Sequence, residues 1–469
     1  MFNFLKKLWR DRRGNALAIA CACMPLVVGA AGLATDTIQW TLWKRQLQRA
    51  ADSAALAGVY DRENASGATT NTAAAVCRDL AVNLHTWMPL LDSTPCTGTV
   101  GSYSSLTYPA DTAVESNQVA LTLRVQQRLP FSSLFMSAAP IITASATAAG
   151  ISTGHPCALA LNGSGTAMNY NGNATVNAPT CILYSDSASA NSASAGGSSS
   201  VTAKAVAGVG GISQSNNFNV SQYLPYSPTI PDPFANITPD TTQMHCAGHY
   251  VTTKVKGVPT TTWVYDSLSE STDMANSTYL DSSGNVQTGA NCWNSLSTSA
   301  SNKTGMTVPN SYSGPIYIDA NAAHGGNGSA DMQGSFSCSS CTIVLTNSDP
   351  TSNTIGTYSA NAQSQTNITS PTTGTYAGIA VFQDRRKTSV STDTINGGSN
   401  NVLTGAVYFP HDTLQINGTG TATSLCAMWV ANNISFLGNS SIAISSPDDT
   451  ACSGKEPGGG SVHIVRLVA

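Results

Sequence analysis

The stretch that most constrains the fold is GNALAIACACMPLVVGAAGLAT, residues 14–35. It runs from Gly14 to Thr35 without a charged side chain, and it carries one proline, Pro25. A helix needs roughly 20 apolar residues to cross the hydrocarbon core of a bilayer. The stretch therefore predicts one transmembrane helix close to the N-terminus.

The charges on either side of this stretch predict its orientation. The cations before it are opposed only by Asp11, whereas the cations after it are fewer and lie further away. The positive-inside rule then places the N-terminus in the cytoplasm and the rest of the chain outside it. A cleaved signal peptide is the alternative, although the apolar run is long and no A-x-A site marks its end. The preceding cations are Lys6, Lys7, Arg10, Arg12 and Arg13.

Residues 36–60 predict a continuation of the same helix beyond the membrane. They contain no proline, they are rich in Ala and Leu, and apolar residues recur at helical spacing. We therefore assign residues 1–60 to a basic cytoplasmic tail, the transmembrane helix and its extension.

Residues 61–150 predict a small α+β stalk domain. A helical pattern is followed by two strands of alternating polarity, with a turn and a short helix between them. The expected ranges are 71–91 for the helix, 117–127 and 141–149 for the strands, and 129–135 for the turn.

The junction between the apolar stretch and its extension combines several specific features. An Arg-Gly pair precedes the stretch, Pro25 lies within it, Asp36 ends it, and LQRAADSAALA follows at residues 47–57. In this combination, the first 60 residues or so resemble TadE/TadG-like Flp (tight adherence) pilus-assembly proteins. The resemblance implies a bacterial inner-membrane protein that acts with other pilus-assembly proteins of the cell envelope. Its motif residues here are Asp36, Leu47, Gln48, Asp52 and Leu56.

Two features of related proteins are missing from this sequence. Prepilins carry Glu five residues after the cleaved Gly, and this chain has Ile19 at that position. TadG proteins often carry a von Willebrand A domain, but its Asp-x-Ser-x-Ser metal motif does not occur here. We therefore expect neither that metal-dependent module nor a bound cofactor. A minor pilin-like subunit, which leaves the membrane for the fibre, stays an alternative role.

The composition excludes one class of partner. Charged residues make up 10% of the chain and the net charge is −4, whereas roughly 25% of a typical soluble protein is charged. No long basic run occurs outside the N-terminus, so nucleic acid is not an expected partner.

The cysteines predict disulfides and therefore export. Two of the twelve, Cys21 and Cys23, lie in the apolar stretch, and the other ten fall as neighbouring couples. Pairing of neighbours is the simplest of many connectivities. The ten are Cys77, Cys96, Cys157, Cys181, Cys246, Cys292, Cys338, Cys341, Cys426 and Cys452.

Residues 151–469 predict a β-rich domain with short apolar strands between Gly, Asn and Ser turns. Gly-bearing turns recur at Gly397, Gly418 and Gly438, a period typical of a parallel β-helix, in which the turns of a solenoid stack into one core. The fold class is thus mainly β with an N-terminal helix, and an antiparallel β-sandwich is the alternative. A Pro-rich interruption begins at residue 225, and we interpret residues 225–310 as an insertion or as a linker with a small subdomain.

Three short motifs in this domain contain residues that can form a site. Cys338-Ser-Ser-Cys341 precedes a strand rather than a helix, which favours a structural disulfide over redox chemistry. His245 and His249 could face together on a helix, but Gly248 argues against that helix and we expect no metal there. Asp384, Arg385 and Arg386 form a weak candidate for binding a saccharide or a partner, and a solvated loop explains them equally well.

No catalytic motif emerges from the sequence. Neither a GxSxG elbow nor a phosphate-binding or dinucleotide loop occurs. The sequence therefore predicts a non-enzymatic pilus-assembly or adhesion component that acts by binding and scaffolding. The alternative is a membrane-tethered β-helix protein that binds or cleaves polysaccharide.

Overall fold

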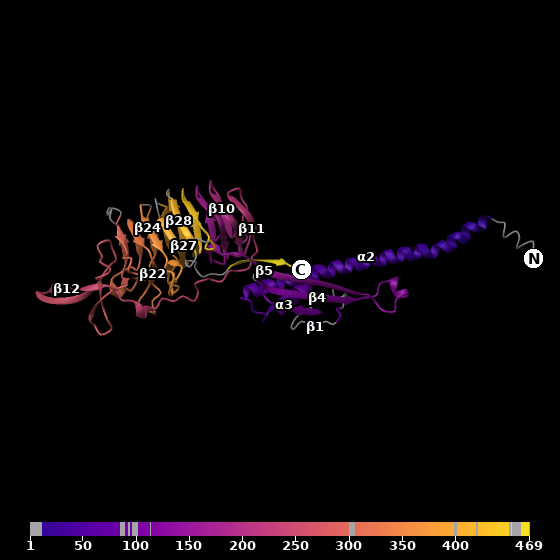
Figure 1. Ribbon diagram of the computed structural model, residues 1–469, viewed down its shortest axis with the longest axis horizontal. Helices are drawn as coiled ribbons and strands as arrows, with labels where there is room; N and C mark the ends of the chain where they lie inside the picture. Colours follow the sequence, from indigo (N-terminus) through magenta and orange to yellow (C-terminus); the bar gives the residue numbers. More distant parts are fainter. Residues whose placement is uncertain are drawn as a thin grey trace, which may run out of the picture. The chain divides into compact units, whose positions relative to one another are not determined.

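The computed structural model describes residues 12–84, 90–91, 94–95, 102–112, 114–299, 305–361, 363–397, 401–418, 421–449, 452 and 461–468. The chain divides into two compact units, residues 1–152 with 465–469 (the helix unit) and residues 153–464 (the β unit). It is mainly β apart from one long N-terminal helix (Figure 1). The predicted cations Lys6, Lys7 and Arg10, and also Cys96, lie outside the described residues.

Helix α2 (Arg12–Asn64) includes both the apolar stretch and its predicted extension. It continues through Pro25 without a break, and side chains in the apolar part, such as Leu26 and Val27, are exposed. Within the described residues, one helix is long and apolar enough to cross a membrane, and it is this one. An exposed apolar surface of this length suggests a single-pass membrane anchor.

The rest of the helix unit is a small sheet that packs on α2. Strands β4 (Glu115–Gln126) and β5 (Ile141–Gly154) pair antiparallel, and alternate residues of β4 are buried. The two predicted strands and the short helix between them, η1 (Ser132–Leu134), are confirmed. Helix α3 (Thr72–Asn83) confirms the start of the predicted helix, while residues 85–89 lie outside the described part. Short strands complete this unit: β1 (Thr94–Pro95) pairs with β2 (Ser102–Tyr103), and the main sheet has the order β3 (Ser105–Thr107), β4, β5, β30 (Val462–Leu467).

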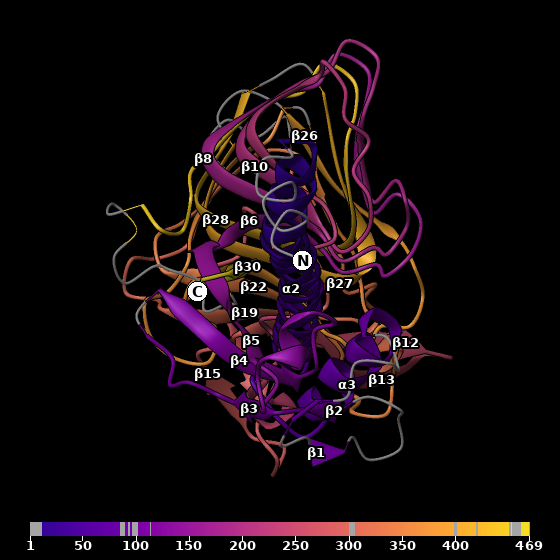
Figure 2. The same cartoon turned by 90° about the vertical axis from the view of Figure 1, so that its right-hand side faces the viewer.

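The β unit contains a sheet of 20 described strands in which neighbouring strands run parallel. The strands stack in three rows, and Figure 2 shows neighbouring strands of a row, such as β8 and β10, overlying one another. Row 1 contains β16 (Cys292–Trp293), β19 (Gly314–Asp319), β22 (Cys341–Thr346), β25 (Ile379–Gln383), the middle of β27 (Asn401–Gly418) and of β28 (Thr421–Phe436), β6 (Pro156–Ala160), and the ends of β8 (Thr175–Ser185), β10 (Ser200–Gly208) and β11 (Phe218–Leu224).

The other two rows are built from the shorter strands and from the ends of the long ones. Row 2 contains β17 (Leu296–Thr298), β20 (Ala330–Met332), β23 (Tyr358–Ala360), β26 (Thr392–Gly397), the ends of β27 and β28, β7 (Met168–Tyr170) and β9 (Ala193–Ala195). Row 3 contains β18 (Met306–Thr307), β21 (Ser335–Cys338), β24 (Gln365–Thr369), the starts of β27 and β28, β29 (Ser441–Ile444), and the starts of β8, β10 and β11.

The order of the strands in row 1 differs from their order in the chain. The row is entered at β6 and followed through β8 and β10 to β11. The chain then re-enters at the opposite end with β16 and returns to β28, which pairs with β6 through Val430 and Leu159. The first strand of the unit is thereby paired on both sides, which protects its edge.

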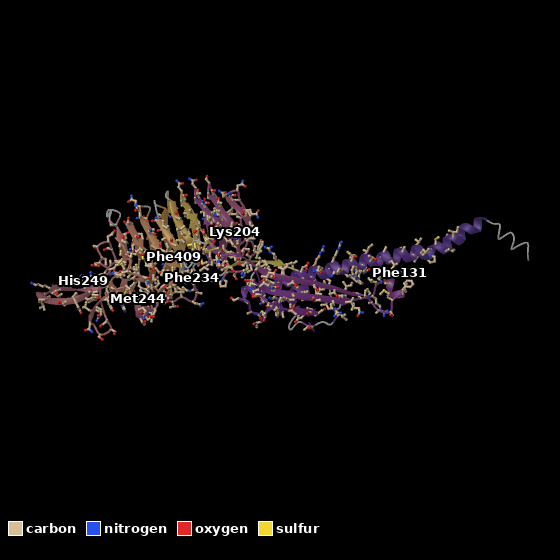
Figure 3. The ribbon with its side chains drawn as sticks, in the orientation of Figure 1. Phe131, Lys204, Phe234, Met244, His249 and Phe409 are labelled. Carbon is tan, nitrogen blue, oxygen red and sulfur yellow. A yellow bond between two sulfur atoms is a disulfide. The ribbon has the colours of Figure 1, made fainter. Side chains whose placement is uncertain are left out.

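The Pro-rich residues 225–244, here called the strap, lie along the outer face of row 1. Ile230 and Phe234 of the strap are buried in one cluster with row 1 residues, and the Phe234 ring meets that of Tyr408 edge-on at 5.2 Å. Figure 3 labels Phe234 and Met244 on this segment. Row 1 is therefore buried on both faces, which explains why its strands are continuous apolar runs rather than alternating ones.

Two antiparallel hairpins separate the strap from β16. They are formed by β12 (Gly248–Val255) with β13 (Val258–Tyr265), and by β14 (Thr278–Leu280) with β15 (Val286–Thr288). Within the predicted interruption at residues 225–310, the structure thus places a strap, two hairpins and then strands β16 to β18 of the parallel sheet.

Candidate functional site

The second half of α2 carries the motif residues, and it is buried against the sheet of its own unit. Leu47, Ala51 and Ala55 are at most 1% exposed and pack in one cluster with Val119 of β4. Small side chains let the helix approach closely; a Cβ added at Gly58 would lie 3.0 Å from the Val119 side chain. The alanine-rich motif is thus a packing surface.

The polar motif residues tie α2 to β5. The side-chain amide of Gln48 donates to the Asp52 carboxylate at 2.7 Å and to the backbone oxygen of Ser145 at 2.8 Å. Leu56 is partly buried against the same cluster. These contacts hold the helix in one rotation and register on the sheet.

Asp36 holds the loop between β4 and β5. Its side chain is 2% exposed and accepts a hydrogen bond of 3.0 Å from the backbone nitrogen of Phe131. It also accepts from the backbone nitrogen and the hydroxyl of Ser132. The sequence singled out Asp36 by resemblance alone, because nothing local in the pattern indicates a partner so far along the chain.

Together, the exposed apolar helix and the packed extension suggest the class of proteins with a single-pass membrane anchor that continues into a small α+β unit. Residues 14–69 match the family model of the TadE/G-like Flp pilus-assembly (Tad) family, which confirms the resemblance for this segment. The match indicates a role in Flp/Tad pilus assembly and a location in the cell envelope. No curated protein and no solved structure matches the chain.

The charged run in the β unit does not form a solvated loop. Asp384 is 1% exposed and accepts from Nε and Nη2 of Arg386 at 2.9 and 2.7 Å. Arg386 also donates to the backbone oxygens of Asn347 and Asp349, each at 2.8 Å. The solvated-loop interpretation is therefore wrong, because these charges satisfy one another and the preceding turn.

Arg385 points to the strap instead. It pairs with Asp232 and donates to the hydroxyl of Tyr408 at 2.7 Å. The Tyr408 hydroxyl also donates to Asp232 at 2.8 Å. Of the three predicted saccharide-site residues, Arg385 is the most exposed, and its visible role is to hold the strap on row 1.

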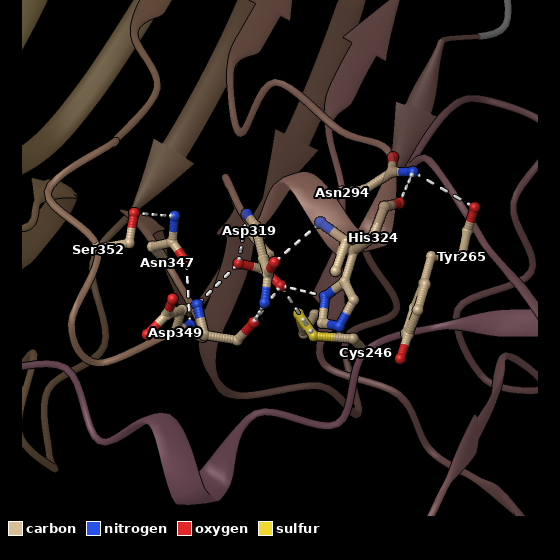
Figure 4. A network of polar contacts seen from close by, with 12 residues as sticks. Cys246, Tyr265, Asn294, Asp319, His324, Asn347, Asp349 and Ser352 are labelled. Carbon is tan, nitrogen blue, oxygen red and sulfur yellow. Dashed lines mark hydrogen bonds and ion pairs between the residues drawn. A yellow bond between two sulfur atoms is a disulfide. The ribbon is translucent and has the colours of Figure 1, made fainter.

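A second polar network lies where β19 and β22 end (Figure 4). Asp319 accepts from the backbone nitrogen and hydroxyl of Ser348 at 2.8 and 2.7 Å, and from the backbone nitrogen of Asn321 at 3.0 Å. His324 Nδ1 lies 2.5 Å from Oδ2, the oxygen that also accepts from the Ser348 hydroxyl. Burial alone would raise the pKa of Asp319, but these hydrogen bonds hold it below its usual value. No sequence motif predicts this network, whose only local signal is a polar residue directly after each apolar strand.

A buried ion pair lies near the end of β25. Lys387 Nζ is 2.5 Å from Asp412 Oδ2, and both side chains are at most 1% exposed. Gln383 donates to the same oxygen at 2.7 Å. Burial, together with the charge of Asp412, raises the pKa of Asp393 well above its usual value. This cluster also binds the backbone of neighbouring segments, at Gly356, Tyr358 and Ser391.

The cysteines of the β unit form disulfides. The sulfurs of Cys246 and Cys292 lie close to Asp319, but they are bonded to each other and leave no thiolate for a metal. Cys338 ends β21 and Cys341 begins β22, so this pair lacks the helix N-terminus that lowers a thiol pKa. The disulfides are Cys157–Cys181, Cys246–Cys292, Cys338–Cys341 and Cys426–Cys452; Cys77 is also disulfide-bonded, while Cys21 and Cys23 are free.

The two histidines considered as ligands take separate partners. The ring of His245 stacks on that of Tyr279 at 4.3 Å, while His249 Nδ1 lies 2.8 Å from the Asp266 carboxylate. They lie on a loop and a strand rather than on one helical face.

One groove of about 360 Å³ lies beside the strap, lined in part by Asp240, Gln243, Tyr317 and Tyr376. The Asp384 cluster does not line it. The predicted saccharide residues are therefore not gathered in this concavity.

Proposed function

We propose that this protein is an inner-membrane-anchored component of Flp/Tad pilus assembly that acts by binding and scaffolding. The observation that carries the proposal is the match of residues 14–69 to the Tad family model. The match lies on a helix whose first half is exposed and whose second half buries one face. Such a helix can hold a folded unit rigidly against the membrane, because it leaves no flexible linker between them.

The orientation in this proposal has the N-terminus in the cytoplasm and the β unit in the periplasm. Basic residues before the apolar stretch support it through the positive-inside rule. The disulfides of the β unit support it as well, because disulfides persist outside the reducing cytoplasm.

We further propose that the β unit is a parallel β-helix that serves as a scaffold without catalysis. The parallel pairing along three rows favours this over an antiparallel sandwich. The charged clusters favour a scaffold, because their ionic groups are engaged with one another rather than turned towards a substrate.

A pair of fusions tests the orientation. Alkaline phosphatase, which is active only outside the cytoplasm, should be active when fused after residue 150 and inactive when fused before residue 12. The reverse pattern would refute the proposed location.

A matched pair of variants tests the role in assembly. Ala54→Glu buries a charge between α2 and β4 and should abolish pili in cells that carry the assembly system. Arg49→Glu, on the exposed side of α2, should leave them. Normal pili with Ala54→Glu, despite protein that is misfolded or missing, would refute a role in assembly.

A further inference from the structure

The loop between β4 and β5 carries exposed apolar side chains at its tip. Leu134, Phe135 and Met136, here called the apolar tip, are 74, 77 and 52% exposed. They lie directly at and after the short helix η1. Three large apolar side chains in succession are unusual on a protein surface that faces only water, and such patches mark contacts with a partner or a membrane.

The apolar tip is held beside the end of the apolar stretch of α2. Asp36 binds the backbone of Phe131 and Ser132, so the loop is attached where the stretch ends. The ring of Phe131 lies against Gly32, where any added Cβ would clash with it. Figure 3 shows Phe131 next to α2. The loop therefore extends back along the helix, towards the membrane, rather than away from it.

We propose that the apolar tip inserts into the leaflet of the bilayer that faces the helix unit, and so gives this unit a second membrane contact. The proposal rests on the proposed membrane span of α2. Lipid is the occupant that we favour, because the loop is attached to α2 at Gly32 and Asp36, on either side of the exposed apolar side chain of Leu33. Arg128, exposed at the base of the loop, can reach lipid phosphates, as cations at the membrane interface do.

A second contact changes what the anchor does mechanically. One helix can tilt and rotate in a bilayer, whereas interfacial side chains set its tilt and rotation. Because Gln48 and Asp36 already lock α2 to its unit, insertion of the apolar tip would set the direction in which the helix unit faces the membrane.

Depth-dependent quenching tests the proposal in the full chain. Cys21 and Cys23 are replaced by Ala, and one new cysteine is labelled with the environment-sensitive fluorophore NBD without reductant. The protein is reconstituted in vesicles of phosphatidylcholine and phosphatidylglycerol, with or without doxyl-labelled phosphatidylcholine. The label is placed at Leu134→Cys in the tip.

Two positions serve as matched controls. Val28→Cys, exposed in the apolar stretch, reports whether α2 is in the bilayer. Val82→Cys is an exposed apolar position of the same unit, at 84% against 74% for Leu134. Its neighbour Asn83 contacts Ser53, 17 residues after Asp36 on α2, or about 26 Å along the helix.

The label at Leu134 should emit at shorter wavelength than the label at Val82 and should be quenched by doxyl lipid. Adding Phe135→Glu should reduce that quenching and leave the quenching at Val28 unchanged. If the label at Val28 is quenched while the label at Leu134 behaves like the one at Val82, insertion of the tip is refuted and the membrane span of α2 is supported. If Leu134 is shielded from aqueous iodide but not quenched by doxyl lipid, a protein covers the tip and the proposal is overturned. If Val28 itself is not quenched, the anchor fails and the tip proposal fails with it.

Discussion

The carboxylate of Asp36 accepts a hydrogen bond of 3.0 Å from the backbone nitrogen of Phe131, which lies 95 positions later in the chain. The bond joins the point where α2 leaves its apolar stretch to the loop between β4 and β5. The conformation of the loop and the position of the helix are therefore coupled. Without the contact, the Asp36 carboxylate and the backbone nitrogens of the loop would lack hydrogen-bond partners.

Replacing Asp36 should release this loop. In Asp36→Ala the backbone nitrogens of Phe131 and Ser132 lose their acceptor, so their amide protons should exchange faster. Hydrogen exchange measured by mass spectrometry on peptides covering residues 129–136, in lipid nanodiscs, would show the change. Asp52→Ala is the control, because the Asp52 carboxylate accepts from Gln48 on the same helix. Unchanged exchange in Asp36→Ala would contradict the coupling.

Replacing Arg386 should destabilise the β unit. Arg386→Ala removes the guanidinium whose Nε and Nη2 both donate to Oδ2 of the buried Asp384 carboxylate. Because Arg386 is partly exposed, we expect a loss of about 2–3 kcal/mol in the free energy of unfolding, somewhat below the range for a fully buried pair. Arg386→Lys should not restore stability, because an ammonium cannot reproduce the planar contact. Urea unfolding measures both.

The matched control is Lys254→Ala on the exposed hairpin strand β12, which should change stability by no more than about 0.5 kcal/mol. If Arg386→Ala and Lys254→Ala have the same free energy of unfolding, the contact between Arg386 and Asp384 does not stabilise the β unit.

The pH dependence of stability should include a contribution from Asp186. Burial raises the pKa of Asp186 to about 7, whereas an unfolded Asp titrates near about 3.9. Because the folded pKa is the higher one, the stability from this group is present below about pH 4 and is lost as the pH rises through about 7. The Ile230 backbone nitrogen donates to the Asp186 carboxylate at 3.0 Å. The side-chain oxygen in Asp186→Asn can still accept this hydrogen bond, but it carries no charge.

Thermal melts at several pH values check this prediction. Asp186→Asn should melt roughly 2–4 °C higher than the parent protein at pH 8, and at the same temperature at pH 4. If the difference in melting temperature between Asp186→Asn and the parent protein is the same at pH 4 and at pH 8, a raised pKa of Asp186 is ruled out.

Among the described cysteines, the free thiols should be confined to the apolar stretch. Alkylation without reductant should modify Cys21 and Cys23, which are free, and none of the disulfide-bonded cysteines of the β unit. Replacing both Cys157 and Cys181, which are 24 residues apart, by Ala should cost roughly 2–5 kcal/mol of stability. The control, Cys21→Ala with Cys23→Ala, should leave stability unchanged; labelling of Cys157 in the parent protein would be inconsistent with the disulfide.

Elements with a local signal could be predicted from the sequence. The apolar stretch identified α2 because crossing a bilayer requires length and the absence of charge, both of which are read residue by residue. Strand β4 was predictable because Val119, Leu121 and Leu123 alternate with polar residues, as on a sheet with one buried face. The candidate site residue Asp36 was also found, but only through the resemblance of its surroundings.

The pairing of distant segments was decided only by the tertiary structure. Val430 pairs with Leu159 across 271 positions, yet backbone hydrogen bonds between parallel strands are the same for any apolar pair, so a strand does not identify its neighbour. The sequence of the strap likewise predicts only a Pro-rich linker. The folded structure shows that Ile230 and Phe234 of the strap pack against the apolar face of row 1. The burial of Asp384 by Arg386 and by residues 346–349 follows from the same stacking, since the sequence alone does not distinguish a charge run from a solvated loop. By itself, the sequence determined which segments are helical, extended or membrane-compatible; the packing of non-local surfaces decided which of them touch.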